Sequence, residues 1–298
     1  MKPVEGTVIA THGPLVRVRV NGETVVMKSR RRLTWEGGEP PSPRLVVGDR
    51  VRAELGGDDG VVVAVRPRAN SLCRSAPHSG RPQVLAANVD HALVVFAARS
   101  PEPRRGLVDR FLAACAIAGI DAVLVINKVD LGTEAVNEWI GVYEDLGYQI
   151  LRVSARTGWG LGQVRRRLAD RTTLFCGPSG AGKSSLLNAV HPGFRLKVGS
   201  ISDVTGKGRH TTSRAELLPL PSGGFVVDTP GVKEFGLLEA DGEALVAAFP
   251  EIAAETGGCR FSDCSHTHEP DCAVRAAVEE GAIDEARYAS FIKIRNSD

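Results

Sequence analysis

The polarity pattern at the start of the chain is that of short β-strands. Valines and arginines alternate over residues 16–20, which is typical of a half-buried strand with one basic face. The Asn-Gly pair at residues 21–22 marks a hairpin turn, and an apolar run at residues 24–27 follows it. Further strands are predicted around residues 49–55 and at residues 61–65. This series favours a small closed β-barrel, either of the oligonucleotide-binding (OB) type or one that binds no nucleic acid.

From residue 89 onward, short apolar runs alternate with helix-length segments. Such alternation is typical of an α/β architecture, a mostly parallel sheet with helices on both faces. Residues 66–88 are rich in Arg, Pro, Ser and Ala without clear periodicity and are predicted to be a linker. The tail from about residue 237 has no strand signal. The predicted strands are 92–97, 122–126, 150–153, 173–176 and 225–228; the predicted helices are 107–117, 134–146, 161–168, 185–190, 243–249, 273–280 and 284–294.

Composition narrows the class of protein. The 298 residues carry 37 Lys and Arg against 35 Asp and Glu, a formal net charge of +2, and 43% of them are hydrophobic. The hydrophobic fraction is high enough to form packed cores and excludes a chain that is disordered throughout. The length predicts two or three domains. No apolar run reaches the ~18 residues of a membrane-spanning helix, and the N-terminal segment lacks the apolar core of a secretion signal. Six cysteines are too few for a disulfide scaffold, so we expect a cytoplasmic protein with no membrane partner.

Arginine outnumbers lysine by 29 to 8. A guanidinium offers a planar fork of donors that suits phosphates and stacks on bases, although a bias in the source genome also produces such a ratio. The first 70 residues carry 12 Lys and Arg against 8 Asp and Glu and include the arginine run at residues 30–32. This excess fits a barrel that binds nucleic acid.

A glycine-rich loop follows the predicted strand at residues 173–176 and matches G-x-x-x-x-G-K-[ST]. Glycines let backbone N–H groups approach phosphate oxygens closely, and the helix that follows adds positive potential at its N-terminus. The Lys183 ammonium would reach the β- and γ-phosphates, and the Ser184 hydroxyl would ligate Mg²⁺. The predicted nucleotide-binding residues of this loop are Gly177, Pro178, Ser179, Gly180, Ala181, Gly182, Lys183, Ser184 and Ser185.

A second motif predicts that the nucleotide base is guanine. Guanine presents two adjacent N–H donors that one carboxylate accepts, and adenine lacks that pair. Asp130 would accept both donors, the Lys128 stem would lie against the ring, and Asn127 would tie this loop to the phosphate loop. Ser154 and Ala155, at the end of the next strand, would place a backbone contact on the guanine carbonyl. The motif is Asn127, Lys128, Val129 and Asp130.

Asp228-Thr229-Pro230-Gly231 closes another strand and supplies a third nucleotide motif. Asp228 would bind Mg²⁺ through water, and the Gly231 N–H would sense the γ-phosphate. In the segment 206–212, Thr212 or its neighbour Thr211 would complete the magnesium shell, with Thr212 favoured.

The order of the motifs is unusual, because the base-reading residues precede the phosphate loop. Moving the chain termini leaves a packed sheet intact, since the two ends of a domain commonly lie close together. The loop after Gly231 then leads directly into the tail, so that GTP state can move the tail.

The tail contains a cluster with the spacing C-x4-C-x-H-x5-C. Three thiolates and one imidazole suit a closed tetrahedral zinc site, which would be structural and would supply folding energy to a segment with little core. His268 is an alternative to His266 that the spacing leaves open. The predicted ligands are Cys259, Cys264, His266 and Cys272.

In this order the motifs resemble the circularly permuted small ribosomal subunit biogenesis GTPases, the RsgA (YjeQ) family. The resemblance covers essentially the whole chain and implies three domains: an OB-type RNA-binding barrel at residues 1–68, a permuted P-loop GTPase domain at 69–236 and a zinc-binding helical domain at 237–298. It implies GTP hydrolysis stimulated by the small ribosomal subunit late in its maturation. It also implies binding to 16S-type rRNA, and cofactors Mg²⁺ and one zinc ion. We further expect a monomer.

Val232 stands where many GTPases carry a water-orienting Gln, and its side chain has no hydrogen-bonding group. The resemblance assigns the catalytic task to His210, which is otherwise a solvent-facing loop residue, beside Lys183 and Thr212. Two rival functions remain at this point. One is a GTP-gated RNA-binding switch whose hydrolysis is incidental, and the other is an ATP-dependent enzyme.

Overall fold

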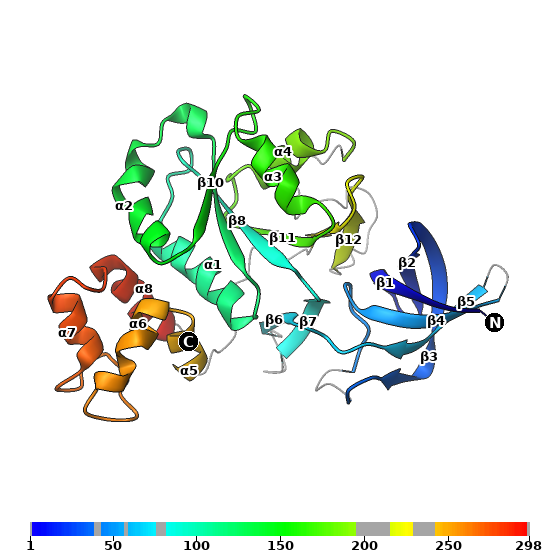
Figure 1. Cartoon of the computed structure of the whole chain (residues 1–298), viewed down its shortest axis with the longest axis horizontal. Coiled ribbons are helices and arrows are strands. Elements are labelled where there is room, and N and C mark those ends of the chain that lie inside the picture. Colours follow the sequence, from blue (N-terminus) through cyan, green and yellow to red (C-terminus); the bar gives the residue numbers. More distant parts are fainter. Residues whose placement is uncertain are drawn as a thin grey trace.

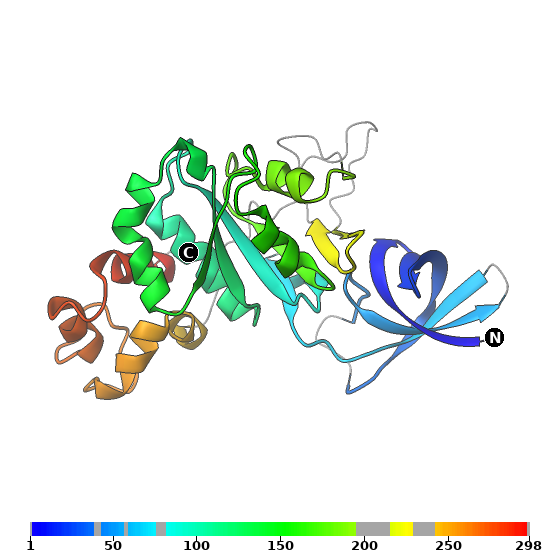
Figure 2. The same ribbon diagram turned by 45° about the horizontal axis from the view of Figure 1, so that its top comes forward.

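The structure is a computed structural model that describes residues 2–38, 43–56, 59–75, 82–194, 215–228 and 242–296. Three parts follow one another along the long axis: a barrel, a central sheet flanked by helices, and a helical tail (Figure 1). The barrel and the tail lie at opposite ends, with the central sheet between them, in both ribbon views (Figure 2). The sequence pattern predicted these three parts: a β-barrel, an α/β domain with a mostly parallel sheet, and a helical tail.

The first part is a closed five-stranded barrel with strand order β1-β2-β3-β5-β4. β1 pairs with both β2 and β4 and so closes the barrel, and β3 and β5 run parallel. The Asn-Gly turn forms as predicted, with positive φ at both residues (47° and 84°). Alternate valines fill the interior. The strands are β1 (Lys2–His12), β2 (Leu15–Val20), β3 (Glu23–Trp35), β4 (Arg50–Gly56) and β5 (Asp59–Val65).

The prediction that residues 66–88 form a linker was wrong in part. Two strands within this segment, β6 (Ser71–Ser75) and β7 (Pro82–Ala87), form a hairpin. Leu72 and Ala86 are fully buried in the core of the central part. Each strand has one or two buried apolar residues, too few to produce a periodicity. The hairpin is therefore set by packing against the central part.

The central sheet has the order β10-β9-β8-β11-β13-β12, in which only β12 is antiparallel to its neighbour. Every residue of β8 is buried, because helices cover both faces. Phe96 packs with α1 and α2 on one face, and Val95 packs with α3 and α4 on the other. The strands are β8 (His91–Ala97), β9 (Ala122–Asn127), β10 (Gln149–Arg152), β11 (Thr172–Cys176), β12 (Glu216–Pro219) and β13 (Phe225–Asp228); the helices are α1 (Arg105–Ile117), α2 (Glu134–Asp145), α3 (Leu161–Leu168) and α4 (Lys183–Val190).

The tail is helical, as predicted, and contains one helix that the pattern missed. α6 has six residues and begins at a proline, so it is too short for a clear helical period. Its neighbours pack around Phe249 and Phe291, whose ring centroids are 5.5 Å apart. The helices are α5 (Gly242–Ala247), α6 (Pro250–Glu255), α7 (Ala273–Glu279) and α8 (Glu285–Arg295).

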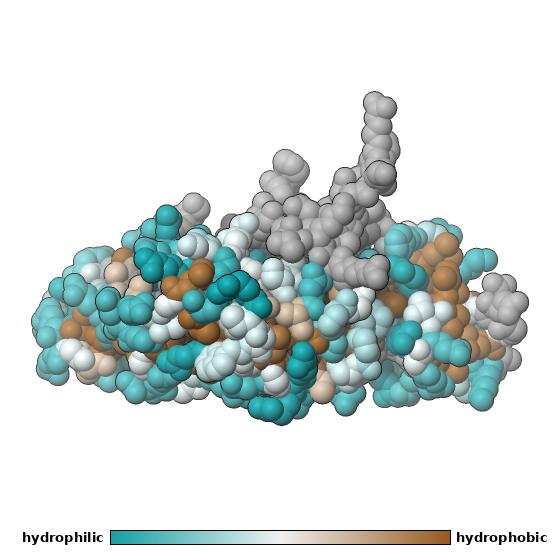
Figure 3. All heavy atoms as spheres, turned by 90° about the horizontal axis from the view of Figure 1, so that it is seen from above, coloured by the Kyte–Doolittle hydropathy of each residue, from teal (hydrophilic) through white to brown (hydrophobic). Residues whose placement is uncertain are grey.

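Both outer parts contact the central part. Arg17 of the barrel forms a salt bridge with Glu216 of β12, and Arg287 of α8 forms one with Asp109 of α1. Hydrophilic residues predominate on the face seen in Figure 3, and hydrophobic residues gather over the barrel at its right end. In the part of the chain that the structure describes, no helix has the length and apolar character needed to span a membrane.

Candidate functional site

The predicted nucleotide-binding loops meet at one edge of the central sheet. In a parallel sheet the carboxyl ends of all strands lie at the same edge, and ligands bind in the crevice outside them. β9 ends at Asn127, β11 ends at Cys176 directly before the glycine-rich loop, and β10 ends two residues before Ser154. Residues separated by about 50 positions in sequence therefore face one site.

The glycine-rich loop connects β11 to α4 and requires its glycines. Gly177 has φ +128°, and a Cβ there would lie 2.1 Å from the Val95 carbonyl oxygen. Gly182 has φ +87°, and a Cβ there would lie 2.4 Å from the Asn127 side-chain nitrogen. Any larger residue would therefore collide with its neighbours at either position. The Lys183 Nζ donates to the carbonyl oxygens of Gly177 and Pro178, both at 2.8 Å, so the ammonium lies over the loop.

Asn127 joins the three loops. Its Nδ2 donates to the Ala181 carbonyl oxygen at 3.0 Å, and its Oδ1 accepts from the Ala155 backbone N–H at 3.1 Å. The residue is 1% exposed, so both bonds form away from water. The tie between base loop and phosphate loop expected from the sequence is present.

Asp130 lies beside this junction with its carboxylate held on both oxygens. Ser154 Oγ donates to Oδ1, and Arg156 Nε donates to Oδ2 at 2.8 Å. The bond from Ser154 is the largest cause that lowers the pKa of Asp130 from its ordinary value of 3.8; partial burial opposes it, and Arg156 lowers it further. The carboxylate is therefore ionised at neutral pH, as an acceptor of two N–H groups must be.

Sequence reasoning missed the contact of Arg156 with Asp130. Arg156 directly follows the predicted site residues Ser154 and Ala155, so its place in the sequence could have suggested that it lies near the site. Its pairing with Asp130 depends on the conformation of the loop, which the sequence pattern does not give. Its side chain is 73% exposed, so solvent screens the pair and the contact contributes little to stability.

Of the predicted site residues between 210 and 232, the structure describes Asp228 and leaves the others undescribed. Asp228 is the last residue of β13, which pairs with β11 beside the glycine-rich loop. His210, Thr211, Thr212 and Gly231, together with Val232, fall in the segments that the structure leaves undescribed.

The four predicted metal ligands come together in the tail. Their ligand atoms all lie within 4.8 Å of one another. The His266 Nδ1 is 3.5 Å from the Cys259 Sγ and 3.6 Å from the Cys272 Sγ, and the two sulfurs are 3.9 Å apart. A tetrahedral ion with metal–sulfur bonds of about 2.3 Å has ligand separations close to these values. The cluster therefore has the donor set and dimensions of a closed metal site.

The structure decides between the two histidines. His266 is 4% exposed and belongs to the cluster, whereas His268 is exposed and its Nδ1 contacts Thr267 Oγ1. Glu269, which sequence reasoning missed, accepts the backbone N–H groups of Ser265 and Thr267 at 2.9 and 3.2 Å. These bonds hold the loop that carries His266 in a fixed turn.

Comparison with known proteins identifies the family. Residues 65–238 match the family model described as RsgA GTPase. The chain belongs to the RsgA GTPase family. A relative from Vibrio vulnificus strain YJ016 is named small ribosomal subunit biogenesis GTPase RsgA 1; it is 42% identical over 262 residues, 85% of this chain and 74% of the relative. A relative from Ectopseudomonas mendocina strain ymp, named small ribosomal subunit biogenesis GTPase RsgA, is 44% identical over 254 residues, 84% of this chain and 74% of the relative.

Solved structures of the same family share the fold. The crystal structure of YjeQ from Thermotoga maritima superposes with a TM-score of 0.79 at 33% identity, covering 99% of this chain and 98% of that one. YloQ, described as a circularly permuted GTPase, superposes with a TM-score of 0.76 at 29% identity, covering 99% and 94%. The RsgA resemblance of the motifs is confirmed, together with the permuted α/β architecture. The chain is a GTP-hydrolysing enzyme.

Proposed function

We propose that this chain acts on the small (30S) ribosomal subunit late in its maturation, where it binds 16S-type rRNA and hydrolyses GTP to GDP and phosphate. The observation that carries the proposal is the junction made by Asn127, which joins a base-reading loop to a phosphate loop in a domain flanked by a barrel and a metal cluster. The relatives named for small ribosomal subunit biogenesis support the choice of partner.

In the proposed site, guanine binds against the Asp130 carboxylate and displaces Arg156, while Lys128 lies along the ring. Ser154 holds the carboxylate in orientation, and the Ala155 backbone faces the guanine carbonyl. The Lys183 ammonium turns from the loop carbonyls to the β- and γ-phosphates. The residues proposed to bind GTP are Asn127, Lys128, Val129, Asp130, Ser154, Ala155, Gly177, Pro178, Ser179, Gly180, Ala181, Gly182, Lys183, Ser184, Ser185, Asp228 and Gly231.

For hydrolysis, we assign His210 to orient the attacking water, because Val232 has no group that hydrogen-bonds to it. We assign Lys183 to stabilise the charge that develops on the transferred phosphoryl group, and Thr212 to complete the magnesium shell beside it. Ser184, Thr212 and Asp228 would hold Mg²⁺, which neutralises phosphate charge when bound.

The metal in the tail is proposed to be zinc. Three thiolates and one imidazole in a tetrahedral arrangement are the donors that zinc prefers in structural sites. All four positions are taken by protein ligands, so the ion has a folding role. We further propose that the protein works in the cytoplasm as a monomer, with the barrel and the tail both contacting rRNA.

A turnover assay tests the proposal. Purified protein is given GTP and Mg²⁺ with and without small subunits, and released phosphate is followed. We expect turnover to rise by at least about tenfold with small subunits, since ordering of catalytic loops by a partner commonly contributes that much or more. Large subunits serve as the control. Equal turnover under all conditions refutes the ribosomal part of the proposal.

A further inference from the structure

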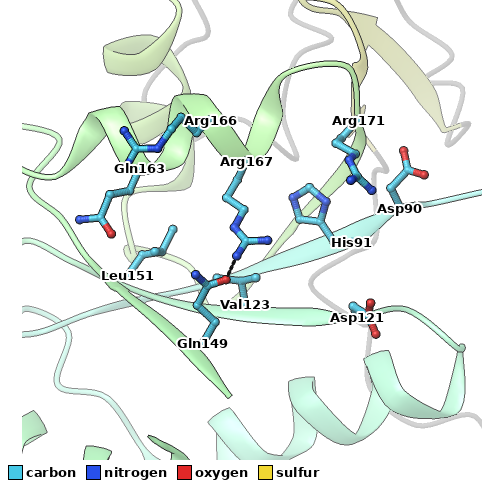
Figure 4. A pocket seen from close by; sticks show the side chains of 10 residues that line it. All are labelled: Asp90, His91, Asp121, Val123, Gln149, Leu151, Gln163, Arg166, Arg167 and Arg171. Carbon is cyan, nitrogen blue, oxygen red and sulfur yellow. Dashed lines mark hydrogen bonds between the residues drawn. The ribbon is translucent and has the colours of Figure 1, made fainter. Parts of the chain in front are cut away.

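A polar pocket lies at the opposite edge of the central sheet from the predicted nucleotide-binding loops. Its cavity of about 490 Å³ opens at the amino ends of the strands. His91 is the first residue of β8 and Gln149 the first of β10, and Arg171 directly precedes β11. Arg166 and Arg167 enter from the last turn of α3, which covers this side of the sheet (Figure 4). No residue of the nucleotide loops lines this pocket.

The three arginines of the pocket have no carboxylate partner among the described residues. Within the described ranges, their one side-chain hydrogen bond joins Arg167 to the neutral Gln149 amide oxygen. The chain pairs many of its other arginines with acids, for example Arg152 with Glu144 at 3.1 Å. Three exposed guanidinium groups around one cavity repel one another, and a bound anion relieves that repulsion.

Two acids, Asp90 and Asp121, also line the cavity and offset part of the arginine charge. The Asp90 carboxylate accepts the Thr172 backbone N–H at 2.6 Å, and the charges of Asp90 and Asp121 both act to raise the pKa of His91. His91, 7% exposed, lies between Arg167 and Arg171. Burial, and next the Arg167 charge, lower the pKa of His91 to about 4, so the imidazole is neutral at neutral pH. Three arginines against two aspartates leave the lining with a formal excess of one positive charge, beside a neutral imidazole that can form hydrogen bonds.

We propose that this pocket binds backbone phosphates of an RNA strand through Arg166, Arg167 and Arg171. Guanidinium forks match phosphate oxygens in a bidentate geometry. The residues that line the cavity include no Phe, Tyr or Trp on which a base could stack, so the contact reads the backbone and not the sequence. The inference rests on the proposed function, since it names a third rRNA contact of the same protein, on the GTPase domain itself.

The test measures binding of purified small subunits in the presence of a non-hydrolysable GTP analogue, as a function of salt concentration. Each phosphate contact that is lost lowers the slope of log affinity against log salt by about 0.7 to 0.9. We expect Arg167→Gln and Arg171→Gln each to lower the slope by about that amount and to weaken binding about three- to tenfold. Unstimulated GTP turnover should stay unchanged, because the pocket is remote from the nucleotide loops.

Arg152→Gln is the matched control. It removes the same charge from the other end of β10, where Glu144 already pairs with it. An unchanged slope in both pocket variants, or an equal loss in the control, overturns the inference. In that event, pyrophosphate that shifts the imidazole NMR signals of His91 would assign the pocket to a free anion instead. Wild-type protein that fails to bind small subunits refutes the proposed function, and this inference with it; binding by wild type and both variants alike refutes only the inference.

Discussion

The Arg287 guanidinium donates to the Asp109 carboxylate at 2.8 Å and thereby joins α8 of the tail to α1 of the GTPase domain. Both side chains are at most 1% exposed, and the two residues lie 178 positions apart. Arg287 also donates to both oxygens of Glu251, at 2.7 and 3.1 Å, and lies 4.6 Å from the centre of the Phe249 ring. Tyr143 of α2 donates to the same oxygen of Asp109 at 2.6 Å. One cation thus compensates two buried acids from different parts of the fold.

Replacing this cation should destabilise the protein strongly. Arg287→Met leaves Asp109 and Glu251 buried without a counter-charge, which costs about 3–5 kcal/mol of unfolding free energy. Urea unfolding monitored by circular dichroism measures the loss. Arg105→Met is the control, because its partner Asp284 is 26% exposed and such pairs contribute about 0–1 kcal/mol. Equal losses in the two variants would contradict a special role for Arg287.

Asp130→Asn should weaken guanine nucleotide binding by a factor of about 10² or more. The amide replaces one acceptor oxygen by a donor that opposes the guanine N–H groups, and a buried polar mismatch is costly. Calorimetry with GDP and, separately, ATP measures the effect. ATP affinity should not change. A variant that keeps the wild-type affinity for GDP would support an enzyme that does not select guanine.

Ser154→Ala should raise the pKa of Asp130, because it removes the largest cause of its lowering. A carboxyl with a lowered pKa favours the folded state above its unfolded value, and this contribution is lost as pH falls through the folded pKa. In the variant this contribution should be smaller, and its loss should be complete at a higher pH, closer to the ordinary value of 3.8. Carboxyl carbon NMR titration of the nucleotide-free protein measures the pKa of Asp130 in the wild type and in the variant. An Asp130 titration identical to that of wild type would show that Ser154 does not control it.

Removing the zinc ion proposed for the Cys259–Cys272 cluster should unfold the tail and leave the sheet folded. The cluster supplies Cys272 to the core that contains Phe249 and Phe291, and structural zinc contributes about 10 kcal/mol or more in small domains. Cys272→Ser should lose one equivalent of metal by elemental analysis and lower the melting temperature. Cys73→Ser, which lies outside the cluster, should retain the metal and the wild-type melting temperature. Full metal content in Cys272→Ser would argue against this ligand set.

His210→Ala should reduce subunit-stimulated turnover by a factor of about 10² with GTP affinity retained, since general positioning of a water contributes on that scale. Single-turnover kinetics separates the chemical step from binding. Turnover equal to wild type would favour the GTP-gated switch with incidental hydrolysis.

Local patterns predicted most of the fold. The strands and helices predicted for the central sheet and the tail end within two residues of those observed, because a buried apolar run or a helical spacing marks each of them. The misses were β1 of the barrel, β12, α6 and the hairpin inside the predicted linker. Their conformation depends on the surfaces they pack against.

The chain's own order of residues determined the family, the guanine nucleotide and the four-ligand cluster. Each of these is encoded by a few residue types at short, fixed spacing, which the backbone geometry of a loop requires. Tertiary structure alone decided that His266 and not His268 faces the cysteines, that Arg156 reaches Asp130, and that three arginines surround one cavity. It also placed Arg287 on Asp109. These contacts depend on which distant residues share a buried surface, and only the packed chain brings them together.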